Sequence, residues 1–353
     1  MIMRLLTYLV SLLLCLTASA ADEELAGDWM LIIKQGRGTM DGVLRIQSTS
    51  GGFVAHVEGG PIRILVDGNN IEMAIDDRTA GGMPFERYLR GSLDGETMAG
   101  EFGPEVPPDE QLKEMCKRLP LACPAPTGTW SATRYVAPPV SSAGPAPVEL
   151  SGVWVSAGSG IRRWTADLTD TAKEWKADFN VELDLPRQRC LSSGLVASFG
   201  FRGSAPEIFH SDNKITMLLG SEVRRIYLDG RQPPEYSDYY PMGFSSGHWM
   251  GSTLVVETTF LMPSVREWMG DPISENARVI EHYSLSEDGI LTGVLTLHDP
   301  DNYKVPMVRR AHWRRSDDSG IKFPTLCDPD SFYRQVYDEG KMDEYIKRGY
   351  RRY

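Results

Sequence analysis

One short phrase occurs twice in this chain, once near its start and once near its middle. Leu25-Ala-Gly-Asp-Trp29 is echoed by Leu150-Ser-Gly-Val-Trp154, and alternating apolar and polar residues follow each copy. Each half then closes on a second Trp segment with basic residues after it, at 128–134 and 311–315. Alternation with a period of two is typical of β-strands with one buried face. The repeat therefore predicts two tandem barrels, each able to enclose a cavity.

The first twenty-one residues have the pattern of an export signal. Arg4 is followed by an apolar run from Leu5 to Leu16 and by small residues up to Ala21. The run is too short for a membrane anchor, and no later run reaches the ~18 apolar residues of a spanning helix. A lipid anchor on Cys15 is the weaker alternative, because leucines precede it where small residues are expected. We expect a periplasmic or secreted protein without membrane insertion.

Acidic residues outnumber basic ones. Asp and Glu total 48 against 37 Lys and Arg, which gives a net charge of −11, or −12 once Arg4 leaves with the signal. Binding to a phosphate backbone or to anionic lipid needs a basic face. We therefore expect no nucleic-acid partner, and the sequence leaves the oligomeric state open.

Four cysteines remain after removal of the signal: Cys116, Cys123, Cys190 and Cys327. An even count in an oxidising compartment favours disulfides. Of the three possible connectivities we favour Cys116–Cys123 across a short loop, together with Cys190–Cys327, which would tie the tail to the second domain. No CxxC motif is present, so we expect neither a zinc site nor a redox site.

The mature chain divides into two domains, a linker and a tail. Residues 22–135 carry short strands with Gly and Asp turns, plus one helix expected around Pro108 to Arg118. Residues 136–149 form a Pro-rich linker. Residues 150–327 repeat the strand pattern with longer elements, and residues 328–353 are helical. The predicted architecture is all-β: two tandem antiparallel barrels with a few short helices and a helical C-terminal tail.

The tail carries an apolar stripe that suits docking onto the second domain. Its members are Phe332, Val336, Met342 and Tyr345. In the second domain, five segments read as strands: 215–219, 224–228, 253–260, 277–284 and 291–298.

Two sequence features could indicate an active site or a metal site, but neither has the context that such a site needs. Gly243-Phe-Ser-Ser-Gly247 matches the Gly-x-Ser-x-Gly of serine hydrolases, where the Ser lies on a turn between a strand and a helix. Here the following residues lead into another strand. The six histidines form neither HxH nor HExxH, and a barrel would have to gather metal ligands from separate strands. We expect no metal and no organic cofactor.

The densest polar cluster lies on strands of the second domain. Strand alternation puts Arg225 and Tyr227 on one face and Arg224 and Ile226 on the other, so one polar set faces inward. A charge inside a barrel is costly unless it is paired. Two interpretations remain open. The cluster is either a lattice of Arg–carboxylate pairs that closes the barrel, or a pocket that holds a His or Tyr ready for proton transfer.

At this cluster the second domain resembles a large family of exported, mostly uncharacterised bacterial proteins. The shared pattern is Arg-x-Ile-x-x-Asp-Gly-Arg at 224–231, Gly-x-Ser-x-Gly-x-Trp-x-Gly-x-Thr-Leu-Val-Val-Glu-Thr at 243–258 and Asp-Pro-x-x-Tyr at 299–303. Arg189-Cys190 and Cys327 also match it. Phe244 and Arg278 stand where His is common in the family. The resemblance implies a lipocalin-like fold, which in tandem form is found in several cofactor-free hydratases, cyclases and lyases.

These observations lead first to an exported, cofactor-independent lyase or isomerase. It would act by proton transfer on a hydrophobic, aromatic or isoprenoid small molecule bound in the second barrel or between the domains. His248 or His282 would move the proton, and Tyr227 would donate to a developing oxyanion. The residues expected to bind and orient the substrate are Arg224, Asp229, Arg231, Trp249, Glu257, His298 and Tyr303. The alternatives are a non-catalytic periplasmic carrier of an apolar ligand and an interaction module of the cell envelope.

Overall fold

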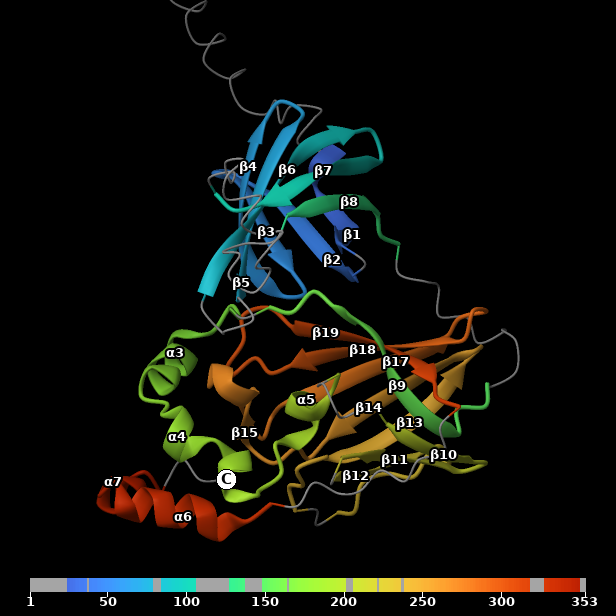
Figure 1. Cartoon of the computed structure of the whole chain (residues 1–353). Coiled ribbons are helices and arrows are strands. Elements are labelled where there is room, and N and C mark those ends of the chain that lie inside the picture. Colours follow the sequence, from blue (N-terminus) through green and yellow to red (C-terminus); the bar gives the residue numbers. More distant parts are fainter. Residues whose placement is uncertain are drawn as a thin grey trace, which may run out of the picture.

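The strands of the computed structural model form two closed barrels, one above the other in Figure 1. The structure describes residues 24–36, 38–78, 84–105, 127–136, 148–163, 165–200, 206–220, 222–235, 238–317 and 327–349. The expected signal, the helix expected around 108–118, Cys116, Cys123 and most of the Pro-rich linker lie outside these ranges. Within them, no helix has the length and apolar character to cross a membrane.

The first barrel has eight strands that follow one another in chain order, and every neighbouring pair is antiparallel. Pairing from Trp29↔Arg134 to Lys34↔Thr129 closes the first strand against the last. The strands are β1 (Gly27–Gln35), β2 (Gly38–Thr49), β3 (Gly52–Val57), β4 (Gly60–Asp67), β5 (Asn70–Arg78), β6 (Pro84–Asp94), β7 (Thr97–Gly103) and β8 (Gly128–Arg134).

The second barrel has nine strands and closes where β9 pairs with both β10 and β19. One pair, β12–β13, is parallel, so this barrel is mixed rather than wholly antiparallel as expected. The reason is the long connection 228–243, which carries the chain back before β13 begins. The strands are β9 (Gly152–Gly160), β10 (Glu207–Ser211), β11 (Lys214–Leu219), β12 (Glu222–Tyr227), β13 (Phe244–Met250), β14 (Thr253–Thr259), β17 (Arg278–Leu285), β18 (Ile290–His298) and β19 (Met307–Arg315).

Short elements fill the segment between β9 and β10 and the segment after β14. The first segment contains α3 (Asp170–Ala177), α4 (Val181–Asp184), the 3-10 turn Pro186–Arg189 and α5 (Gly194–Ser198). The second contains β15 (Ser264–Val265), the 3-10 turn Glu267–Met269 and β16 (Pro272–Ile273).

The repeated Trp phrase joins the first and last strands of each barrel in the same way. Trp29 and Trp154 are fully buried, and each indole N–H donates to a leucine carbonyl four residues earlier at 2.9 Å. The guanidinium of Arg134 lies 3.9 Å from the Trp29 ring centroid, and that of Arg315 lies 4.8 Å from Trp154. A glycine stands two residues before each Trp, and the arginine packs closely against it. A Cβ on Gly27 would lie 2.7 Å from Arg134 Nη1, and a Cβ on Gly152 would lie 3.0 Å from Arg315 Nη1. The repeat seen in the sequence is therefore a repeated barrel closure.

The two barrels share backbone hydrogen bonding and a tightly fitted turn. Asp41 of β2 pairs in parallel with Gly160 of β9, so the strands of both barrels form one continuous sheet. The turn between β3 and β4 lies against β19, where the Val308 N–H donates to the Glu58 carbonyl at 3.0 Å. A Cβ on Gly59 would lie 2.2 Å from the Pro306 carbonyl oxygen. The barrels are therefore packed together at a defined position.

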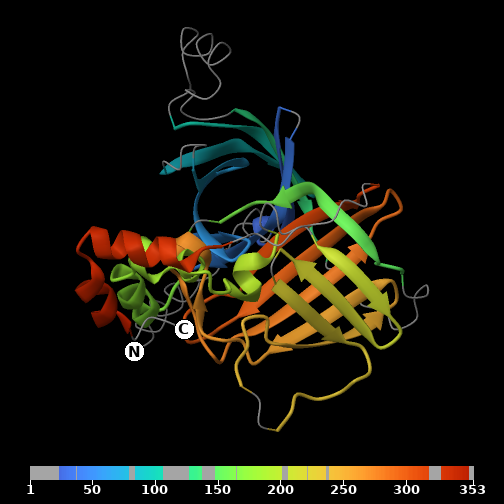
Figure 2. The same cartoon turned by 60° about the horizontal axis from the view of Figure 1, so that its bottom comes forward.

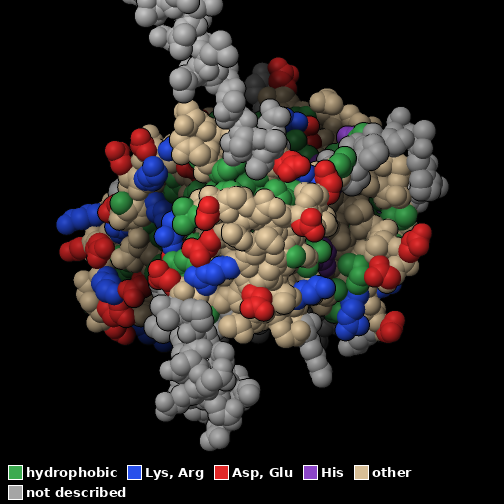
Figure 3. Space-filling view, turned by 90° about the horizontal axis from the view of Figure 1, so that it is seen from above, with side chains coloured by type: hydrophobic (Ala, Val, Ile, Leu, Met, Phe, Trp, Pro, Cys, Tyr) green, Lys and Arg blue, Asp and Glu red, His purple; other side chains and the backbone are tan. Residues whose placement is uncertain are grey.

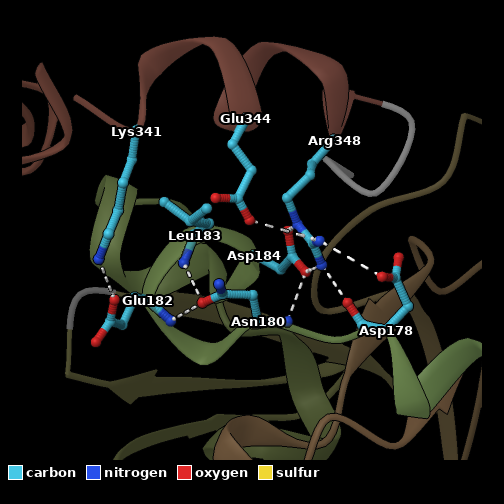
Figure 4. Close-up of polar contacts among 8 residues, drawn as sticks. All are labelled: Asp178, Asn180, Glu182, Leu183, Asp184, Lys341, Glu344 and Arg348. Carbon is cyan, nitrogen blue, oxygen red and sulfur yellow. Dashed lines mark hydrogen bonds and ion pairs between the residues drawn. The ribbon is translucent and has the colours of Figure 1, made fainter. Parts of the chain in front are cut away.

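The C-terminal tail forms α6 (Pro329–Asp338) and α7 (Met342–Lys347), which lie beside the short helices α3 and α4, outside both barrels (Figures 1 and 2). The expected disulfide Cys190–Cys327 is present and fixes the start of the tail. The expected stripe of Phe332, Val336, Met342 and Tyr345 packs with Leu183 in a small separate core. Figure 4 shows the polar side of this contact, in which Arg348 reaches the buried Asp184 and Lys341 reaches Glu182.

Candidate functional site

The residues expected to form the site do not converge in one place. Arg224 points into the second barrel, whereas Tyr227, Asp229 and Arg231 lie outside it at the end of β12. The remaining expected residues lie on the outer wall, at the ends of strands or in the core, and are described in turn below.

Arg224 is the centre of a buried network inside the second barrel. It is 1% exposed, and its guanidinium forms a two-pronged ion pair with the fully buried Glu281, with Nη1 at 2.9 Å from Oε1. It also donates to the Ser245 hydroxyl at 3.1 Å and to the Thr258 hydroxyl at 2.9 Å. The Tyr283 hydroxyl donates to Glu281 at 2.8 Å. Burial lowers the pKa of Arg224, but Glu281 more than offsets this and the net pKa is raised.

This network compensates for a weak seam in the barrel wall. Only Ile226↔Ser245 and Tyr227↔Ser246 pair β12 with β13, whereas β12 pairs with β11 over its whole length. Through Arg224, side chains link β12 to β13, β14 and β17 just inside this seam. The arrangement is that of an ion-pair lattice that closes the barrel, and its donors and acceptors are already occupied.

His248 and His282 lie on the outer wall, away from this network. His248 and His282 are both in register with Val255 of the strand between them, and His248 is exposed. Partial burial lowers the pKa of His282, against a smaller rise caused by Glu281. Glu257 is also on the surface, where it pairs with Arg278. Neither histidine lines any of the clefts described below.

Tyr227 borders a cleft of about 400 Å³ at the weak seam, which we call the β12–β13 groove. Its ring stacks on Phe244 with centroids 5.5 Å apart, and the Arg231 guanidinium lies 4.3 Å from the Tyr227 ring. Arg231 forms an exposed ion pair with Asp229. The groove is lined by Glu222, Val223, Arg225, Tyr227, Pro234 and residues 240–245.

The last three expected residues are separate from one another. Trp249 packs against the core and lies near His210, with ring centroids 5.7 Å apart. His298 ends β18 opposite Arg278, and burial lowers its pKa. Tyr303 is 4% exposed, and its hydroxyl has no hydrogen-bond partner within the described part of the chain. Burial raises the pKa of Tyr303 well above its ordinary value.

A cleft that the sequence did not indicate opens in the wall of the first barrel. We call it the β3–β4 cleft; its volume is about 490 Å³. Pairing between β3 and β4 stops at Ala55↔Ile62, although β3 extends back to Gly52 and β4 continues to Asp67. The two strands therefore diverge, and the cleft lies where the ladder ends.

One part of the wall of the β3–β4 cleft is apolar. Phe53, Ile62 and Ile64 line it and are partly buried against the first-barrel core. Val54 and Leu65 flank it on the outer surface, 43% and 68% exposed. Exposed side chains of this kind are sites where binding of an apolar molecule removes water from hydrocarbon surface.

A histidine–carboxylate pair that joins the two domains also lines the β3–β4 cleft. His56 Nε2 of β3 lies 3.5 Å from Asp167 Oδ2, which belongs to the segment after β9. Lys304 lies 3.9 Å from the other oxygen of Asp167. On another wall, Arg63 donates to the Tyr88 hydroxyl at 2.8 Å and pairs with Glu86. No sequence signal could have found the His56–Asp167 pair, because it depends on how the two barrels pack.

Further polar groups lie between the barrels and line neither the β3–β4 cleft nor the β12–β13 groove. His312 Nε2 is 2.7 Å from Asp41 Oδ1, and its Nδ1 is 3.0 Å from the Thr292 hydroxyl. Beside them, Glu58 is buried and accepts from Arg310 at 2.6 Å. Burial raises the pKa of Glu58, and Arg310 opposes that rise. Among the described residues, no three His, Cys, Asp or Glu are grouped to hold a metal.

Comparison with known protein families and with curated proteins finds no match for this chain. Among solved structures, one match is a protein with unknown function from the DUF3598 family of Nostoc punctiforme PCC 73102. It is 9% identical, and the superposition covers 83% of this chain and 97% of that chain with a TM-score of 0.24. A likeness this slight carries no information about the function of this chain.

Proposed function

We propose that this chain is an exported binding protein for a small, largely apolar molecule with one polar end. The molecule occupies the β3–β4 cleft, with its polar end at His56 and Asp167. The observation that carries this proposal is the combination of an apolar wall and an interdomain His–carboxylate pair in one cleft. A volume of about 490 Å³ falls within the ordinary range for small-molecule sites.

The apolar part of the cleft provides the driving force for binding. Each of Val54 and Leu65 loses water when an apolar ligand covers it, at roughly 25 cal/mol per Å² of surface removed. Phe53 and Ile64 line the cleft from the core side and give it a rigid inner wall.

The polar part of the cleft provides orientation. The imidazole of His56 can donate or accept one hydrogen bond, and the Asp167 carboxylate accepts. A ligand hydroxyl that accepts from the His56 ring and donates to the Asp167 carboxylate would replace water without leaving either group unpaired. The expected ligand therefore has a single hydrogen-bonding end on a hydrocarbon or aromatic body.

The binding proposal is tested with the fluorescent apolar probe 1-anilinonaphthalene-8-sulfonate. Leu65→Asp places a charge on the apolar flank of the cleft, and we expect it to weaken probe binding at least ten-fold. The matched control is Ile346→Asp, because Ile346 is 59% exposed on α7, remote from the cleft. Equal probe affinity in both variants, with unchanged unfolding curves, would overturn the proposal.

A second candidate function is proton transfer on the bound molecule, as a lyase or isomerase. The His56–Asp167 pair favours it, because a carboxylate beside an imidazole can orient the ring for proton transfer. The test uses the molecule that co-purifies with the protein, incubated in D2O with wild type and with His56→Gln. Deuterium entering a C–H position, detected by mass spectrometry, in wild type alone supports catalysis. Equal deuterium content in both leaves the binding function and removes the enzymatic one.

A further inference from the structure

Within the described part of the chain, one edge of β12 beside the β12–β13 groove lacks a strand partner over half its length. Residues Glu222 to Tyr227 of β12 all pair with β11 on one side. On the other side, pairing with β13 covers only Ile226 and Tyr227. Tyr240, which precedes β13, pairs instead with the segment after β14: its N–H donates to the Phe260 carbonyl, and its carbonyl accepts from the Met262 N–H. The first half of β12 therefore has an open edge beside the groove.

The backbone groups at this edge can be assigned from the ladder. The Leu228 N–H donates to the Asn213 carbonyl, in line with the β11 pairing. Hydrogen-bonding direction alternates along an antiparallel strand, so Arg224 and Ile226 also bond to β11. Val223 and Arg225 then direct their N–H and C=O groups into the groove. The Ile226↔Ser245 pairing engages the Arg225 C=O, so within the described residues the N–H and C=O of Val223 and the N–H of Arg225 have no backbone partner.

The side chains around this edge are exposed and largely apolar. Val223 is 47% exposed and Tyr240 is 50% exposed. Tyr227 and Phe244 form a stacked aromatic wall on the same groove. An exposed apolar surface beside an open strand edge is the combination that accepts an added strand.

One charge on the outer face gives the edge its selectivity. Arg225 is exposed and has no ion-pair or side-chain hydrogen-bond partner in the described part of the chain. It stands between Val223 and Tyr227 on the outer face of β12, since alternate side chains of a strand share a face. Glu222 lies at the start of the strand, and alternation places its side chain on the other face, with Arg224.

We infer that the β12–β13 groove binds an extended peptide of a partner protein, which adds to β12 as a strand. On its outer face the peptide presents an apolar residue beside Val223, an acidic residue beside Arg225 and an apolar residue beside Tyr227. Backbone hydrogen bonds to Val223 and Arg225 hold the strand, and the cross-strand side-chain pairs select its sequence. This peptide site is separate from the small-molecule cleft of the first barrel.

The experiment is a selection of random seven-residue peptides displayed on phage, made on the full-length protein. Val223→Pro is the counter-selection target, because it removes the N–H that faces the groove and spares the β11 ladder. We expect enriched peptides with an Asp or Glu flanked at two residues on either side by apolar side chains. In titration, the labelled consensus peptide should bind Val223→Pro and Arg225→Glu at least ten-fold more weakly than wild type.

The control and a second readout separate strand addition from adsorption. Arg314→Glu is matched to Arg225→Glu, since Arg314 is exposed on a strand whose two edges are both paired, and it should bind like wild type. Hydrogen exchange of residues 222–227 should slow when the consensus peptide is added. The inference is overturned by no enrichment over Val223→Pro, by enriched peptides without an acidic residue, or by unchanged exchange in this segment.

Discussion

At the scale of single residues, the second barrel depends on one guanidinium. Arg224 donates hydrogen bonds to Glu281, Ser245 and Thr258 at once, where few residues of β12 and β13 pair. Such a group is fully desolvated, so it stabilises the fold only because all of its hydrogen-bonding groups have partners, not through its charge alone. Its neighbour Arg225 has the same chemistry but faces outward, and its role is recognition.

We predict that Arg224→Met lowers the free energy of unfolding by about 3–5 kcal/mol, because it leaves Glu281 buried without a counter-charge. The measurement is urea unfolding followed by intrinsic fluorescence. The double variant Arg224→Met/Glu281→Gln should recover part of the loss, since Gln keeps an acceptor for the Tyr283 hydroxyl. Arg225→Met should change stability by less than about 0.5 kcal/mol. Similar losses in both single variants would contradict this account.

His282 should make the protein more sensitive to acid. Partial burial lowers its pKa in the folded state below the ordinary value of 6.5. The unfolded chain therefore takes up the proton first as the pH falls. The stabilising contribution is complete above pH 6.5 and is lost as the pH falls through the lowered folded value. We expect His282→Gln to lose less stability than wild type between pH 7.5 and the acidic end of this window, measured by urea unfolding at each pH. Parallel losses would refute the assignment.

At the scale of elements, the C-terminal helices are held by a disulfide at one end and an ion pair at the other. Arg348 follows α7, and its Nε lies 2.9 Å from Oδ1 of Asp184, which is 1% exposed. The same guanidinium reaches Asp178, as Figure 4 shows. Between these two ends the apolar contact is small, and includes Phe332 and Tyr345.

We predict that Arg348→Ala frees α7 while Cys190–Cys327 keeps α6 attached. Asp184 would then be a buried carboxylate without its arginine counter-charge. Because a buried unpaired charge is unfavourable, opening of α7 to water becomes easier. Hydrogen exchange of residues 341–349 should be at least ten-fold faster than in wild type. Lys347→Ala is the matched control, because Lys347 is the exposed neighbour and should leave exchange unchanged. Equal exchange in the two variants would show that the apolar contact alone holds α7.

At the scale of the whole molecule, contacts of the β3–β4 turn couple the two barrels. Glu58 accepts from Arg310, and Gly59 with φ +81° fits against Pro306. The face seen in Figure 3 carries acidic and basic side chains interspersed with hydrophobic ones. No single sign of charge dominates that face, so short-range fit rather than long-range attraction governs what approaches it.

We predict that Gly59→Ala uncouples the barrels, because its Cβ would lie 2.2 Å from the Pro306 carbonyl oxygen. Scanning calorimetry should show unfolding separated into two transitions. Gly68→Ala is the matched control: Gly68 also has positive φ, at +58°, but has open space around it. Both substitutions strain the backbone by a similar amount, roughly 1 kcal/mol. If the two variants melt alike, the turn does not couple the barrels.

The sequence by itself determined that the chain forms two β-barrels that each begin at a Trp phrase and that the tail carries an apolar stripe, and it favoured the Cys190–Cys327 pair among three connectivities. These features rest on short periods and fixed spacings, which a chain carries locally wherever it folds. Alternation also showed that Arg224 and Arg225 must lie on opposite faces. It could not say which of the two faces inward.

The tertiary structure decided which face of each strand points into the barrel. It also decided that β12 and β13 pair in parallel and that the β3–β4 ladder ends early. It also brought His56 of one domain to Asp167 of the other, and it separated His248 and His282 from the buried arginine. These outcomes depend on register between strands far apart in the chain and on how two finished barrels pack together. Register and packing are properties of the assembled surfaces, so no local pattern encodes them.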